Sequence, residues 1–152
     1  MATTERVQAY EELRRVCAEQ GWKCTPQRLA VYAHLRGNLT HPSVNEVWEA
    51  VRQEIPSITR ESVFRILTEL SGIGLIARMD KIVDARFDGR ADDHGHLVCE
   101  RCGCVMDFEL PTGLPLPESL HGFRARHTEL RISGLCASCA AALSVEEESK
   151  RI

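Results

Sequence analysis

Four cysteines stand in two short pairs, each with two residues between its members: Cys99-x-x-Cys102 and Cys136-x-x-Cys139. A C-x-x-C spacing lets both sulfurs of one turn reach the same ion, and four thiolates are a ligand set typical of structural zinc. Two redox dithiols, or simply buried cysteines, are the alternative interpretations. Because a four-thiolate site has no open coordination position, we expect it to stabilise a fold and not to catalyse a reaction. The other cysteines are interpreted as ordinary core or surface residues: Cys17, Cys24 and Cys104.

A second group of residues could bind a metal through nitrogen and oxygen. His94-x-His96 places two imidazoles on the same side of an extended strand. Asp88, Asp107 and His41 are further candidates, although each also suits an ordinary loop or turn. Such donors favour iron(II), manganese or zinc over calcium. The spacing alone leaves both interpretations open.

The elements before these residues read as four helices. Thr25 before Pro26 is a cap followed by proline at the first helical position, and Ser43 with Glu46 matches a capping box. Apolar residues at helical spacing predict helices over about 5–20, 26–36, 43–55 and 60–71. Two short alternating strands follow, at 75–79 and 82–87, and this order is typical of a winged helix-turn-helix.

The second half of the chain predicts a smaller unit. Residues 88–93 are polar and acidic and read as a hinge, which gives an N-terminal domain over 1–87 and a C-terminal domain over 94–152. Short apolar stretches at 97–99, 104–108 and 130–135 precede a last helix at about 137–147. A unit of this size buries little surface alone, so we expect a metal staple or a partner subunit. The predicted fold class is α+β.

Composition limits the classes of protein that fit. The chain has 152 residues, a formal net charge of −3 and seven cysteines. No apolar run is long enough to cross a membrane, and the first residues lack the pattern of a signal peptide. We therefore expect a cytoplasmic protein, in which clustered cysteines bind metal more often than they form disulfides.

Several segments together resemble the ferric uptake regulator (Fur) superfamily, in its order, from about residue 8 to 142. They are Thr25-Pro26-Gln27-Arg28, His41-Pro42-Ser43, Ala85-Arg86-Phe87-Asp88, the run Asp93 to Gly103, and Gly134 to Cys139. The resemblance implies a homodimeric, metal-dependent transcriptional repressor and not an enzyme. Its winged helix would bind AT-rich palindromic operators in double-stranded DNA, and its C-terminal α/β domain would dimerise and hold the zinc.

The resemblance also implies a regulatory metal between the domains, bound by a set carried over position by position: His41, Asp88, His94, His96 and Asp107. Aspartate at both acidic positions resembles the peroxide-sensing PerR branch of the family, whereas iron sensors usually have glutamate there. In that branch iron(II) reacts with hydrogen peroxide and a ligand histidine is oxidised, which here would be His41 or His94. Manganese would fill the same site without that chemistry.

Two departures from the family pattern concern DNA and a further ion. The fourth helix reads Ser62-Val63-Phe64, where the family commonly has Thr-Val-Tyr, so one hydroxyl contact to DNA is lost. The expected DNA contacts are Arg28, Ser62, Phe64 and Arg65. Many family members bind an extra ion through the residue between the two histidines, but that residue is Gly95 here. We therefore expect no extra site, although Asp107 and His127 match other parts of it.

Three other functions compete with this interpretation. The first is a repressor that senses iron or zinc sufficiency without peroxide chemistry. A zinc hydrolase has little support, because the sequence contains no H-E-x-x-H helix. In the third, peroxide would oxidise the zinc-bound thiolates themselves, which react more slowly than a free thiol of low pKa.

Overall fold

The computed structural model describes residues 3–80, 84–90, 92–112, 122 and 129–149. The chain divides into two compact units, Met1–Ala91 and Asp92–Ile152, and the division falls within residues 88–93. Each unit is described by itself below.

Unit 1 begins with four helices: α1 (Thr3–Gln20), α2 (Pro26–Leu35), α3 (Val44–Val51) and α4 (Arg60–Gly72). Side-chain caps fix where three of them start. The hydroxyl of Thr25 accepts a hydrogen bond from the backbone N–H of Arg28, and Ser43 forms the predicted capping box with Glu46. These caps satisfy backbone N–H groups that have no partner inside the helix.

The apolar faces of the four helices pack into one hydrophobic core. The predicted apolar stripe of α4 is buried at all four of its positions, which are Val63, Ile66, Leu67 and Leu70. Trp48 of α3 packs partly buried against this core, and its indole N–H donates to the carbonyl of Ile58 at 3.1 Å. The core therefore fixes the orientation of α4, whose opposite face stays exposed.

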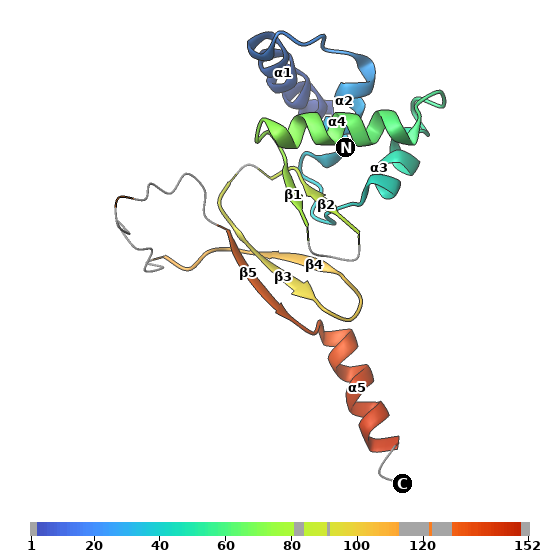
Figure 1. The fold of residues 1–152 in the computed structure, drawn as a ribbon, viewed down its shortest axis with the longest axis vertical. Coiled ribbons are helices and arrows are strands. Elements are labelled where there is room, and N and C mark those ends of the chain that lie inside the picture. Colours follow the sequence, from blue (N-terminus) through green and yellow to red (C-terminus); the bar gives the residue numbers. More distant parts are fainter. Residues whose placement is uncertain (1–2, 81–83, 91, 113–121, 123–128, 150–152) are drawn as a thin grey trace. The chain divides into compact units, whose positions relative to one another are not determined.

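A two-stranded antiparallel sheet completes unit 1 (Figure 1). Strand β1 (Ala77–Met79) pairs with β2 (Arg86–Asp88), with Arg78 opposite Phe87. Both strands are shorter than predicted, and positions 82 and 83 of the second predicted strand lie outside the described residues. Helices followed by this hairpin agree with the predicted winged helix-turn-helix.

Unit 2 is built on a three-stranded sheet in the order β4-β3-β5. Strand β3 (Gly95–Cys99) pairs antiparallel with β4 (Val105–Phe108) and parallel with β5 (Leu130–Gly134). Helix α5 (Ala137–Ser149) follows β5 directly (Figure 1). The predicted α+β fold class is thus confirmed. None of the helices described is long and apolar enough to cross a membrane.

Candidate metal centres

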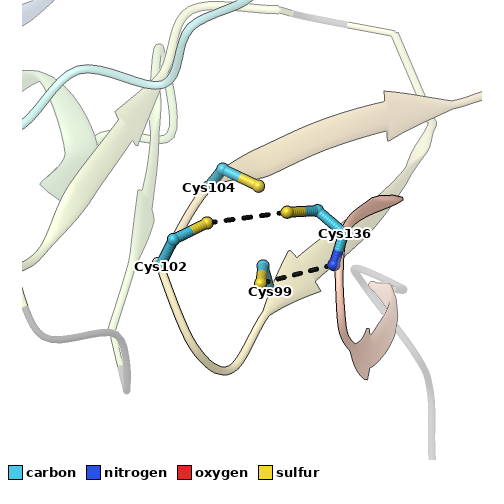
Figure 2. A group of neighbouring side chains, drawn as sticks. All are labelled: Cys99, Cys102, Cys104 and Cys136. Carbon is cyan, nitrogen blue, oxygen red and sulfur yellow. Dashed lines mark hydrogen bonds between the residues drawn. The ribbon is translucent and has the colours of Figure 1, made fainter. Parts of the chain in front are cut away.

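Four cysteine side chains of unit 2 converge in one cluster: Cys99, Cys102, Cys104 and Cys136 (Figure 2). Their sulfurs all lie within 4.8 Å of one another, and the sulfurs of Cys102 and Cys136 are 3.8 Å apart. Thiolates at the usual zinc–sulfur bond length of about 2.3 Å, at the corners of a tetrahedron, are about 3.8 Å apart. The spacing therefore fits a zinc ion bound by thiolates.

The backbone of β3 and its neighbours brings these cysteines together. Strand β3 ends at Cys99, and the chain turns through Gly103, whose φ of 72° is in the left-handed region. The N–H of Gly103 donates to the carbonyl of Cys99 at 2.9 Å. Because β5 runs parallel to β3 and Gly134 lies opposite Cys99, the chain delivers Cys136 to the same end of the sheet.

Backbone N–H groups stabilise the thiolate form of two of the cysteines. The N–H of Cys102, together with the N–H of Cys136, which donates to the sulfur of Cys99 at 3.3 Å, lowers the pKa of Cys99 to about 5. The N–H of Cys139 likewise lowers the pKa of Cys136. Because the thiolate is the form that binds metal, this part of the site is prepared for a cation.

The cluster overlaps the predicted zinc ligands at Cys99, Cys102 and Cys136. Its fourth member is Cys104, which the sequence interpretation treated as an ordinary residue. Cys139, in the first turn of α5, lies beside the cluster, where its thiol donates to the sulfur of Cys136, and this bond raises the pKa of Cys139 to about 12. The position of Cys104, just after the glycine of a tight turn, was the sequence signal for its proximity.

In unit 1, a histidine and an aspartate face each other as a buried pair. Nε2 of His41 lies 3.8 Å from Oδ2 of Asp88, and both residues are at most 1% exposed. His41 has a φ of 49°, a conformation that costs a non-glycine residue energy and often occurs at functional sites. Arg86 donates to the carbonyl of His41 at 3.0 Å, and the N–H of Phe87 donates to the carbonyl of Pro42 at 3.1 Å. These bonds hold His41 against β2.

The residues after Asp88 fix its carboxylate. Oδ1 accepts a hydrogen bond from the N–H of Arg90 at 2.8 Å, which leaves Oδ2 toward His41. A Cβ atom at Gly89 would lie 2.4 Å from the carbonyl oxygen of Leu35, so only glycine fits where the chain passes the end of α2. The sequence analysis did not single out Gly89.

In unit 2, two histidines and an aspartate form a second group. His96 of β3 lies opposite Asp107 of β4, and Nε2 of His96 is 3.7 Å from Oδ1 of Asp107. Nε2 of His94 is 3.5 Å from the same oxygen. Nδ1 of His94 lies 2.7 Å from the carbonyl of Asp92, to which it donates in the tautomer that presents Nε2 to Asp107.

Both groups have the chemistry of a site for iron(II), manganese or zinc. The histidine nitrogens lie 3.5–3.8 Å from the aspartate oxygens, which is at or beyond the upper limit for a hydrogen bond. Two ligand atoms bound to one such metal ion usually lie about 3–4 Å apart, so these distances fit a shared ion. The nitrogen and oxygen donors are also the types that these metals accept. The five predicted ligands are thus a pair in unit 1 and a set of three in unit 2.

The packing of the β3–β4 ladder explains why glycine stands at position 95, between the two histidines. A Cβ atom at this position would lie 2.3 Å from the ring of Phe108, its partner across the β3–β4 ladder. The ring therefore takes the space that a ligand side chain would need. His127, the other residue considered for an extra ion, lies outside the described residues.

The predicted DNA contacts divide into an exposed group and a residue that joins two helices. Phe64 is 47% exposed on α4, and Arg65, next to it, has a side chain that is 61% exposed. Ser62 lies in the first turn, where its N–H bonds to the cap residue Thr59. The guanidinium of Arg28 lies 2.6 Å from the carboxylate of Glu69, so it ties α2 to α4.

Comparison with known proteins places the chain beside bacterial regulators. A family model described as "Ferric uptake regulator family" matches residues 19–133. The peroxide operon regulator of Bacillus subtilis is 32% identical over 92% of this chain and 97% of its own. The peroxide-responsive repressor PerR of Staphylococcus aureus is 29% identical over 80% of this chain and 84% of its own.

The solved structure of the ferric uptake regulator of Helicobacter pylori has a similar fold. It superposes with a TM-score of 0.71 at 21% identity, over 89% of this chain and 93% of its own.

Proposed function

Because the chain belongs to the ferric uptake regulator family, we propose that it is a metal-dependent, DNA-binding transcriptional repressor of peroxide-stress genes. It would detect hydrogen peroxide through oxidation of a ligand histidine. The observation that carries this proposal is that aspartate supplies both acidic donors, Asp88 beside His41 and Asp107 beside His94 and His96. This is the pattern of the peroxide-sensing branch that the sequence resembles.

The regulatory ion would join the two units. His41 and Asp88 of unit 1, with His94, His96 and Asp107 of unit 2, would hold one iron(II) or manganese ion. Binding would favour the arrangement of the units that fits DNA, and couplings between two such sites are typically about 1–3 kcal/mol. The hydrogen bond of Arg86 to the carbonyl of His41 and that of the Arg90 N–H to the carboxylate of Asp88 would keep these donors in place before the ion arrives.

Bound iron(II) would supply the redox chemistry that lets peroxide react at the site. Overall, one oxygen atom of hydrogen peroxide adds to an imidazole carbon of His41 or His94, and the other leaves as water. An oxidised imidazole binds metal poorly, so the two units lose their common ion and the operator is released. Manganese would hold the same donors without this reaction.

The exposed face of α4 would read DNA as one half of a homodimer on an AT-rich palindromic operator. Phe64 can pack on a thymine methyl group, and Arg65 can reach a base edge or a phosphate. Ser62, in the first turn of α4, can contact the sugar-phosphate backbone of DNA. Arg28 would contribute by holding α4 through Glu69, in addition to any contact of its own with DNA.

The zinc centre would have a structural role in the cytoplasm, where thiols stay reduced. Cys99, Cys102, Cys136 and Cys139 were the predicted ligands, and thiolates that fill every zinc position leave none for a substrate. Zinc would stabilise the small unit 2 and, through it, the dimer. Hydrogen peroxide would be the only small molecule on which the protein acts.

Mass spectrometry of metal-loaded protein tests this function directly. Protein loaded with iron(II) receives stoichiometric peroxide, manganese-loaded protein is the control, and operator binding is measured in parallel. We expect one added oxygen on the peptide of His41 or His94, only with iron and in step with the loss of DNA binding. His41→Ala should abolish the response, whereas His34→Ala, which removes a histidine of α2 outside the donor set, should leave it intact.

Metal-dependent DNA binding without oxygen addition would overturn peroxide sensing and indicate a repressor that senses iron or zinc sufficiency. A peroxide response that survives His41→Ala would instead indicate oxidation of thiols.

A further inference from the structure

We propose that Cys104 is a fifth thiol of the zinc centre and takes one tetrahedral position in exchange with Cys139. The inference rests on the zinc part of the proposed function. Its first support is the cluster itself, because Cys104 stands in the set of four cysteines whose sulfurs lie within 4.8 Å of one another. Cys104 points toward the other three side chains in Figure 2.

The hairpin between β3 and β4 explains why Cys104 points into the cluster. Val98 pairs with Val105, so the next pair outward is Cys99 with Cys104, and the N–H of Cys99 donates to the carbonyl of Cys104 at 2.9 Å. Residues opposite each other in an antiparallel pair carry side chains on the same face, with Cβ atoms about 5 Å apart. The backbone therefore aims Cys104 at the ion that Cys99 would bind.

Cys139 is the neighbour of the cluster on helix α5. It lies three residues after Cys136 in the first turn of α5, and residues at this spacing are neighbours on a helix. Because Cys136 belongs to the cluster, this spacing places Cys139 next to one of its members. Two complete ligand sets thus share three thiols and differ only in the fourth.

Zinc in a structural site accepts four thiolates, so five thiols leave one uncoordinated. The fourth position can be filled from the hairpin by Cys104 or from the helix by Cys139. A variant that lacks either Cys104 or Cys139 therefore still has four thiols for the zinc. A variant that lacks Cys102, which belongs to both ligand sets, has only one incomplete set in either arrangement.

Serine variants and metal content test the proposal. Cys104→Ser, Cys139→Ser and the double variant are compared with Cys24→Ser, which removes an exposed cysteine of unit 1. After dialysis against a chelator, each single variant should keep about one zinc per chain, and the double variant should lose zinc at least tenfold faster. Cobalt(II) in place of zinc should show a four-thiolate tetrahedral spectrum in both single variants.

The proposal is overturned if Cys139→Ser alone loses zinc as fast as the double variant, or gives a three-thiolate cobalt spectrum. It is also overturned if the double variant keeps its zinc. If a variant does not fold, alkylation of cysteines in the wild-type zinc protein tests the proposal instead. Label should divide between Cys104 and Cys139 while Cys99, Cys102 and Cys136 stay protected, and label on Cys104 alone would contradict exchange.

These readouts do not depend on peroxide. Failure of histidine oxidation would leave the zinc content and the cobalt spectra unchanged. Failure of ligand exchange would equally leave the peroxide response of the regulatory site intact, so the two proposals stand or fall separately.

Discussion

Replacing Gly89 with alanine tests how Asp88 is held in place. A Cβ atom at residue 89 would lie 2.4 Å from the carbonyl oxygen of Leu35 and 2.6 Å from its carbonyl carbon. An ordinary contact is at least about 3.4 Å, so one of the two backbone segments must move by about 1 Å. Neither is a flexible side chain that could turn away.

The cost can be derived from this overlap. Inserting a methyl group into a well-packed region typically costs about 1–3 kcal/mol, and we expect about 2 kcal/mol here because both partners are backbone. Since urea lowers the free energy of unfolding by about 1–3 kcal/mol per molar, the midpoint should fall by about 1–2 M. The displacement of the backbone should also move the Asp88 carboxylate away from His41. If about 1.4 kcal/mol of the cost falls on this pair, the regulatory metal should bind about tenfold more weakly.

Both tryptophans of the chain, Trp22 and Trp48, lie in unit 1, so their fluorescence follows the unfolding of the unit that contains Gly89. Gly72→Ala is the matched control. A Cβ atom at Gly72 meets nothing within 4 Å, and alanine near the end of a helix should be neutral or slightly stabilising. Equal urea midpoints for Gly89→Ala and Gly72→Ala would refute the close packing of residue 89 on α2.

Three further outcomes are expected. The backbone N–H of Ser43 and the charge of Arg86 lower the pKa of Glu46, so its stabilising effect is present above the ordinary carboxyl pKa and is lost as the pH falls through the lowered value. Glu46→Gln should therefore lower the Tm at pH 7, and this loss should shrink as the pH falls through the lowered pKa of Glu46; a loss that does not change with pH would contradict the ionic role. Arg28→Ala should cost about 1–3 kcal/mol by circular dichroism, because Glu69 is left partly buried, and an unchanged transition would show that the pair adds nothing. Removing zinc should speed hydrogen exchange in β3 and β5 and leave the tryptophan transition unchanged, whereas a fall in that transition would mean that zinc also stabilises unit 1.

The helices could be predicted from the sequence because their signals are local. A cap such as Thr25 or Ser43 acts on backbone groups two or three residues away, and an apolar stripe such as that of α4 is complete within one helix. The two C-x-x-C pairs could be predicted on the same basis, because such pairs at short spacing have few other uses. The set of His41, Asp88, His94, His96 and Asp107 could not, because spacing left it open and only the resemblance to the family supplied it.

The remaining features depend on contacts between distant parts of the chain. No local pattern indicates that β5 runs parallel to β3, yet this pairing brings Cys136 to Cys99. The register of the hairpin, which aims Cys104 at the cluster, is set by a turn whose geometry depends on Gly103. The left-handed backbone of His41 is likewise stabilised by a hydrogen bond from Arg86 of β2, which is 45 residues away in the sequence.

Strand β3 constrains how the sequence of this protein can change. Within its five residues it carries His96, a proposed donor to the regulatory metal, and Cys99, a proposed zinc ligand, and their odd spacing puts them on opposite faces of the strand. Inserting or deleting a single residue between them would reverse one face relative to the other, so no shift in register could keep both donors directed at their ions. We therefore expect evolution to vary the side chains of Leu97 and Val98 while the length of this segment stays fixed.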